Sequence, residues 1–148
     1  GVTTLISAAL YQRLIRLRVP KLTAPPPWSV EEARIRKAFG GLAEAVLPQA
    51  KRKHARSAAR IAILRDRWPE IRDGLAARTL PTPSALRATL LAAGAPNTLA
   101  DLNEPRANAA RVFRLARDIR DRVTVLDLAF ETGLLPGAIA AVLDDAGV

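Results

Sequence analysis

Apolar residues at helical spacing, divided into short segments by proline and glycine, constrain the fold of this chain more than any other feature. Residues 3–18 form the first segment, and its apolar positions recur at steps of three and four: Leu5, Ile6, Leu10, Leu14 and Leu17. Pro20 ends the segment, because proline disfavours helical geometry in the residue before it. No segment combines strand alternation with hairpin-turn chemistry. The sequence therefore predicts an all-α protein.

Capping and helix-breaking residues predict the next helices. Ser29 and Glu32 have the spacing of a capping box, so we expect a helix to begin at residue 30. That helix meets a break at Gly40-Gly41, and the following segment is expected to be interrupted at Pro48. A short helix is expected within residues 51–67, with Ala58, Ile61, Ala62 and Leu64 as its apolar face.

Trp68-Pro69 is expected to turn the chain into a helix over residues 70–78, since proline suits a first helical position. Ser84 is the expected cap of a helix that Gly94 ends, and Thr98 with Asp101 opens a short turn. The segment from Pro105 to Asp121 is the longest clear helical pattern.

The last two expected helices complete the bundle. Thr124 and Asp127 form a second capping box, Gly133 stops that helix, and Pro136-Gly137 starts the last one. We expect about eight helices in a compact bundle, forming one domain over residues 1–148.

Composition agrees with this fold and removes several kinds of site. The chain is 49% hydrophobic but only 4% aromatic, which favours close-packed aliphatic helices. It has no cysteine and one histidine, so its own His and Cys residues cannot form a zinc site of ordinary ligand count.

We expect no membrane span and no signal peptide, and hence a cytoplasmic protein. The abundance of arginine and alanine is typical of GC-rich genomes, so we expect a bacterial source.

Charge is unevenly distributed along the chain. Residues 1–78 hold sixteen Lys and Arg against six Asp and Glu, whereas residues 79–148 hold seven against eight. The densest basic run, residues 51–67, could follow nucleic-acid phosphates. It contains no aromatic stacking residue, and we expect it to be a solvated helix face.

Candidate catalytic residues are few. His54 lies inside the basic run and is expected to be a solvated surface residue. The acidic pairs Glu31-Glu32 and Asp144-Asp145 are adjacent in helices, so their side chains point to different faces. Asp118 and Arg122 are expected to form an i,i+4 pair, and Arg120 and Arg122 are candidates for phosphate binding.

Three stretches together resemble one protein family. They are A-F-G-G-L-A-E-A-V-L (38–47), L-R-A-T-L-L-A-A-G-A-P (86–96) and I-R-D-R-V-T-V-L-D-L-A-F-E-T-G-L-L (119–135). In order and spacing they resemble the C-terminal helical domain of the sn-glycerol-1-phosphate dehydrogenases, which belong to the group containing iron-dependent alcohol dehydrogenases and dehydroquinate synthases. Pro48 and Val123 depart from the family pattern. The resemblance implies a dehydroquinate synthase-like C-terminal domain.

The resemblance also implies where the chemistry would lie. In that family a Rossmann-like N-terminal domain binds NAD(P), and an Asp and two His hold a divalent metal (zinc, nickel or iron). One of those His residues opens an H-G-x-x-V-G segment that enters a helix, and Gly1-Val2-Thr3-Thr4-Leu5 resembles its last glycine and that helix. The metal and nucleotide ligands would then lie upstream of residue 1, so none is assigned to a residue of this chain.

The function that the resemblance implies is NAD(P)-dependent reduction of glycerone phosphate. We expect this activity only when a nucleotide-binding half or a second chain is also present. Thr3 and Thr4 at a helix N-terminus, with Arg120 and Arg122, are the candidate cleft residues for the phosphorylated substrate. A homo-oligomer is an open possibility. Two alternatives remain: a stand-alone helical domain reused as a cofactor-free enzyme pocket or interaction scaffold, and a basic nucleic-acid-binding module.

Overall fold

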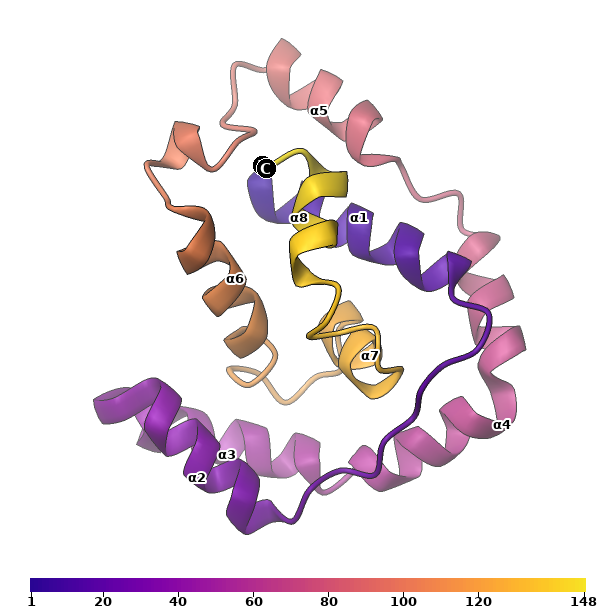
Figure 1. Cartoon of the computed structure of the whole chain (residues 1–148), viewed down its shortest axis with the longest axis vertical. Coiled ribbons are helices and arrows are strands. Elements are labelled where there is room, and N and C mark those ends of the chain that lie inside the picture. The colour runs from indigo at the N-terminus through magenta and orange to yellow at the C-terminus, as the bar shows by residue number, and fades with distance from the viewer.

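Helix α1 lies at the centre of the fold. The computed structural model describes all of residues 1–148, and in it α1 contacts helices α4, α5, α7 and α8 (Figure 1). The helices are α1 (Val2–Arg16), α2 (Trp28–Phe39), α3 (Ala43–His54), α4 (Ser57–Ala76), α5 (Pro83–Ala92), α6 (Arg106–Leu115), α7 (Val125–Glu131) and α8 (Ile139–Ala146), with 3-10 turns η1 (Gly40–Leu42) and η2 (Ala100–Leu102). There is no strand, so the predicted all-α class and helical bundle are confirmed.

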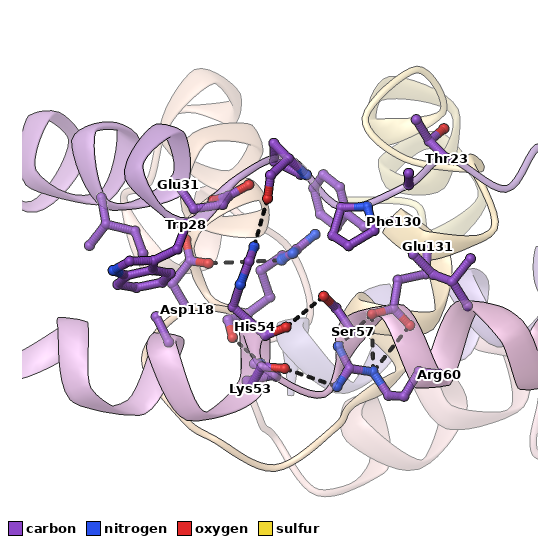
Figure 2. Close-up of a pocket in the computed structure, with 17 residues that line it drawn as sticks. Thr23, Trp28, Glu31, Lys53, His54, Ser57, Arg60, Asp118, Phe130 and Glu131 are labelled. Atoms are coloured by element: carbon purple, nitrogen blue, oxygen red, sulfur yellow. Dashed lines mark hydrogen bonds and ion pairs between the residues drawn. The ribbon is translucent and has the colours of Figure 1, made fainter.

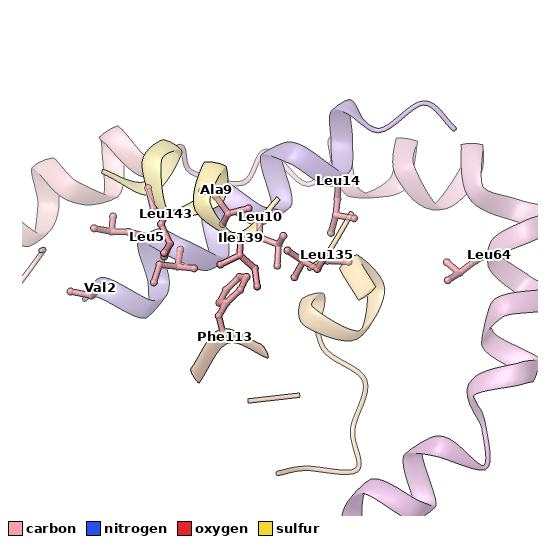
Figure 3. Close-up of a cluster of buried hydrophobic side chains, with 14 of the residues drawn as sticks. Val2, Leu5, Ala9, Leu10, Leu14, Leu64, Phe113, Leu135, Ile139 and Leu143 are labelled. Atoms are coloured by element: carbon pink, nitrogen blue, oxygen red, sulfur yellow. The ribbon is translucent and has the colours of Figure 1, made fainter. Parts of the chain in front are cut away.

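The main apolar core forms around α1. Leu5, Leu10 and Leu14 are fully buried on one face of this helix, as the three- and four-residue spacing predicts. Side chains of α8 and α6, including Leu143 and Phe113, meet that face (Figure 3). The apolar contribution of α1 therefore holds the surrounding helices together.

The α2–α3 hairpin has a separate, smaller core. Ile35 of α2 is buried against α3, with Trp28 and Phe39 packed at the edge. This cluster shares no residue with the main core, and Figure 1 shows α2 and α3 together at one side of the molecule, away from α5 and the C-terminus. Contacts other than a common apolar core must therefore contribute to fixing the hairpin in place.

Several predicted helix ends are confirmed. Thr124 and Asp127 form the expected capping box at the start of α7. Gly94 and Gly133 follow α5 and α7 with positive φ angles of 63° and 72°, the left-handed region that glycine enters without strain. The chain also breaks at Gly40, as expected.

The predicted start of α2 and the predicted interruption at Pro48 are wrong. Helix α2 begins at Trp28, because the carbonyl of Pro27 accepts the first helical hydrogen bonds and the Glu32 side chain pairs with Arg36 instead of capping. Helix α3 continues through Pro48 to His54. Burial of the residues on both sides of Pro48, Leu47 and Ala50, stabilises the helix against the loss of one hydrogen bond.

The middle of the chain also differs from its predicted pattern. The Trp68-Pro69 turn is a bend within α4, where Arg67 has non-helical φ and ψ angles. Ile61 and Leu64 are buried as expected, but Ala58 and Ala62 are exposed. Thr82 rather than Ser84 caps α5, since Pro83 occupies the first helical position and the Thr82 side chain accepts from the amide of Ala85.

Helix α6 is much shorter than the predicted helix of residues 105–121. It ends at Leu115, after which the carbonyl of Arg117 accepts a hydrogen bond from Lys53 of α3 instead of from the helical ladder. Phe113 is buried, but Val112 and Ile119, two other apolar residues of the predicted helix, are exposed. A tertiary contact therefore replaces the local pattern at this point.

None of the helices combines the length and apolar character that crossing a lipid bilayer requires.

The turn at η2 provides a test of stability against pH. Asp101 accepts hydrogen bonds of 2.9 Å from the backbone amides of Asn97 and Thr98, and these bonds lower the pKa of its carboxyl group below its ordinary value. A carboxyl group with a lowered folded-state pKa stabilises the fold above its ordinary pKa, and this stabilisation is lost as pH falls through the lowered value.

We expect Asp101→Asn to reduce the melting temperature at pH 7, and this difference from the native chain to shrink toward zero near pH 2. Thermal unfolding followed by circular dichroism at both pH values checks this. Asp66→Asn, which changes an exposed aspartate without hydrogen bonds, is the control. A difference that stays constant with pH would contradict the role of the carboxylate.

Candidate functional site

A polar cavity of about 190 Å³ lies where the α2–α3 hairpin meets the rest of the molecule (Figure 2). Residues 23–26 form one wall, since the prolines at 25–27 keep this connector extended. The other walls come from α2, α3, α4, α7 and the segment after α6. The cavity is therefore built by segments from both halves of the sequence.

A buried ion pair lies beside this cavity. The Lys53 ammonium is 2.9 Å from the Asp127 carboxylate, and the two residues are only 5% and 1% exposed. Lys53 also donates to the carbonyl of Arg117, and Asp127 also accepts from the backbone amide and the hydroxyl of Thr124. Both charges are thus paired and hydrogen-bonded, which a buried ion pair requires.

Two further ion pairs lie near the first, and the three pairs together form a polar layer between the α2–α3 hairpin and the rest of the molecule. Arg60 of α4 contacts Glu131 at the end of α7 at 2.5 Å and donates to the carbonyl of Lys53. On the other side, Arg34 of α2 makes two hydrogen bonds to Asp118, at 3.0 and 3.1 Å. These pairs connect the α2–α3 hairpin and α4 to the C-terminal half.

The Arg34–Asp118 contact corrects the predicted pair of Asp118 with Arg122. Helix α6 ends before Asp118, so the i,i+4 geometry on which that prediction depended does not exist. Burial lowers the pKa of Arg34, but the hydrogen bonds to Asp118 and Glu31 outweigh it and the pKa is raised. Arg34 is therefore firmly cationic.

His54 is not the solvated residue that its sequence context predicts. Its ring is half-buried, lies edge-on to Trp28 at 5.4 Å between centroids, and places Nε2 2.8 Å from the carbonyl of Pro26. The tertiary approach of the proline-rich connector covers the ring. His54 thus attaches the connector to α3.

The basic run of residues 51–67 is largely occupied by contacts within the chain, rather than forming a fully solvated face. Besides Lys53 and Arg60, Arg52 pairs with Asp121 at 3.1 Å and Arg56 donates to the carbonyl of Asp121. The hydrogen bond from Arg52 lowers the pKa of Asp121. Much of the excess positive charge of the first half therefore faces acidic and carbonyl groups of the second half.

The acidic pairs have structural contacts. Glu31 and Glu32 lie on different faces and pair with Arg34 and Arg36. Asp144 and Asp145 pair with Arg106 and Arg13.

The four predicted cleft residues line different hollows. Thr3 lies in an apolar hollow of about 400 Å³ between the start of α1 and α6, and Thr4 is exposed beside it on α1. Arg120 and Arg122 line a smaller hollow of about 200 Å³ with Gln49 of α3. The structure thus places the two threonines and the two arginines on separate surfaces.

The polar cavity offers charge and hydrogen bonds rather than a nucleophile with its base. Ser57 donates at 2.6 Å to the carbonyl of His54, not to the imidazole ring, so the two form no Ser–His pair. No three His, Cys, Asp or Glu side chains gather where they could hold one metal ion.

Sequence patterns missed Lys53, Arg34 and Glu131 as members of a common cluster. Asp127 was identified as a capping residue, but its partner Lys53 lies 74 positions away. The only signal was the uneven charge of the two halves, which indicated attraction without specifying which residues meet.

No protein family, no curated protein and no solved structure matches this chain.

The buried pair predicts a large stability difference between two lysines of α3. Lys53→Met leaves the Asp127 carboxylate buried without its main partner, which costs about 3–5 kcal/mol of unfolding free energy. Lys51→Met, at an exposed position of the same helix, is the matched control and should change the unfolding free energy by less than about 0.5 kcal/mol. Urea unfolding followed by tryptophan fluorescence measures both. Equal effects of the two substitutions would contradict the assigned role of the ion pair.

Proposed function

We propose that this chain is the helical, cleft-forming half of an NAD(P)-dependent oxidoreductase similar to sn-glycerol-1-phosphate dehydrogenase. In this proposal it acts on glycerone phosphate and is inactive in that reaction without a nucleotide-binding half. The dehydroquinate synthase-like fold belongs to the same proposal.

The observation that carries the proposal is the apolar hollow at the start of α1. Nine of its fourteen lining residues are hydrophobic, and Val112 and Leu102 are 57% and 46% exposed there. Exposed apolar surface around a hollow is typical of a binding or interdomain face. The family resemblance places the interdomain cleft at the start of this same helix.

The first turn of α1 supports a phosphate-bearing substrate at that face. It contains no acidic residue, and Thr3 lies at the hollow where the helix begins. The backbone amides of Thr4 and Leu5 bond to the carbonyl of Gly1, while the first amides of the helix have no partner within it. A helix N-terminus of this kind attracts phosphate groups.

The residues of this chain do not fit a metal site, and the family resemblance puts the nicotinamide contacts in the nucleotide-binding half. It has one histidine, no cysteine and no acidic cluster that could share a metal ion. We therefore assign to it no step through either group. Its role is to bind and orient the phosphorylated substrate, while a metal and a nicotinamide held by the other half would polarise the carbonyl and supply hydride.

A fusion enzyme tests this proposal. The chain is joined behind the nucleotide-binding half of an established sn-glycerol-1-phosphate dehydrogenase, in place of that enzyme's own helical half. We expect oxidation of NAD(P)H that depends on glycerone phosphate, with neither half active by itself. A fusion that binds NAD(P)H and keeps its helical circular dichroism but shows no turnover would contradict the proposal, as would activity of the chain alone.

The same fusion tests the candidate cleft residues. Loss of the hydroxyl of Thr3, which lies at the hollow, should raise KM for glycerone phosphate about fivefold in Thr3→Val, as expected for the loss of one hydrogen bond. Thr89→Val removes a hydroxyl from an exposed residue of α5 and should leave KM unchanged. Arg120→Gln and Arg122→Gln, in the separate hollow, should also leave KM unchanged. A KM that rises in the arginine variants but not in Thr3→Val would contradict binding of the substrate phosphate at the start of α1.

A stand-alone ligand-binding domain is the second candidate. The polar cavity favours it, because residues 23–26 and several helices of this chain line that space without a second chain. Specific small-molecule binding by the chain alone, together with an inactive fusion, would favour this candidate.

A further inference from the structure

Three arginines surround a hollow of about 460 Å³ on the side of α2 that faces the end of α6. Arg34 comes from α2, Arg114 from the last turn of α6, and Arg117 from the turn that follows. Phe130, Leu115 and Pro136 provide an apolar wall, and the carboxylate of Glu31, which is paired with Arg34, also lines the hollow. None of the predicted cleft residues Thr3, Thr4, Arg120 and Arg122 lines this hollow.

The guanidinium of Arg117 donates no hydrogen bond within the chain. The guanidinium carbon lies 4.7 Å from the centre of the Phe130 ring, and the buried Nε atom has no hydrogen-bond partner. The nearest carboxylate oxygens, of Asp118 and Asp127, are 3.8 and 3.9 Å from Nε, beyond hydrogen-bond distance. The side chain is 26% exposed, so part of it reaches the surface.

The neighbouring acids have closer partners. Asp118 accepts two hydrogen bonds from Arg34, and Asp127 is paired with Lys53. One more positive than negative charge lies in this cluster, which consists of Arg34, Lys53, Arg114 and Arg117 with Glu31, Asp118 and Asp127. The hollow therefore faces a local excess of positive charge.

Arg114 adds a second free guanidinium. It is exposed and makes no hydrogen bond within the chain, whereas all three nitrogens of Arg34 are bonded to Glu31 or Asp118. The dipole of α6 favours a cation in its last turn, which accounts for Arg114 at this position. It does not account for the buried, unbonded Nε of Arg117 beyond the helix end.

We propose that this hollow binds a small phosphate monoester, with Arg114 and Arg117 donating to the phosphate oxygens. One guanidinium donates two parallel hydrogen bonds, which occupy both oxygens of a carboxylate. A phosphate monoester has three terminal oxygens and can accept such pairs of hydrogen bonds from two guanidinium groups. Arg34 positions the site by engaging Asp118, and the apolar wall suits the carbon part of the ester. This site is separate from the proposed substrate cleft and does not depend on the proposed function.

Nuclear magnetic resonance titration of the whole chain with glycerol 1-phosphate, inorganic phosphate and acetate tests the site. We expect the Nε–H signals of Arg114 and Arg117 to shift with the two phosphates, and acetate to bind at least tenfold more weakly. Arg114→Gln should weaken phosphate binding at least tenfold. Arg65→Gln, which removes an equal charge from an exposed arginine outside the hollow, should not.

Further variants separate this site from the hollow that Arg120 and Arg122 line and from a purely structural role of Arg117. Arg120→Gln and Arg122→Gln should leave binding at Arg114 and Arg117 unchanged, and Arg117→Lys should keep the fold, by circular dichroism, but weaken binding. If binding fails only in Arg120→Gln or Arg122→Gln, the phosphate binds in the hollow that these two arginines line and this inference is wrong. Equal binding of acetate, or equal losses in Arg114→Gln and Arg65→Gln, would also overturn it.

Discussion

The buried pair of Lys53 and Asp127 is the contact on which the arrangement of this protein depends. The α2–α3 hairpin buries its own small apolar cluster and shares no buried apolar residue with the core around α1. Lys53 connects the two regions, since its ammonium group contacts both the carbonyl of Arg117, after α6, and the carboxylate of Asp127, in the first turn of α7. A charge buried so deeply requires partners in fixed positions, and we infer that the pair helps to specify the orientation of the hairpin.

The other ion pairs of the polar layer lie at the same boundary between the hairpin and the rest of the molecule. Arg34 and Arg60 pair with Asp118 and Glu131 across the same boundary, and the proline-rich connector closes over it through His54. Cations supplied by the first half of the chain thus meet carboxylates and carbonyls of the second. Four of the seven Lys and Arg residues in the basic run of residues 51–67 make such contacts: Arg52, Lys53, Arg56 and Arg60.

Two of the hollows in this structure are proposed binding sites. One is the apolar hollow at the start of α1, on which the proposed dehydrogenase role depends, and the other is the arginine-lined hollow beside Phe130. They differ in chemistry because α6 contributes apolar residues such as Val112 to one, while its last turn contributes Arg114 to the other. A short helix that ends at Leu115 is what allows Arg117 to turn toward Phe130.

The sequence by itself determined the helical class, the buried face of α1, the capping box of α7 and the glycines that end α5 and α7. Each of these depends on residues within a few positions of one another, where spacing decides geometry. Only the tertiary structure decided the end of α6, the passage of α3 through Pro48, the burial of Lys53 and the partial burial of His54. These depend on partners tens of residues away, whose packing and hydrogen bonds outweigh local preference. The pairing of the charged residues belongs to the second group, because opposite charges attract without specifying which of many partners will meet.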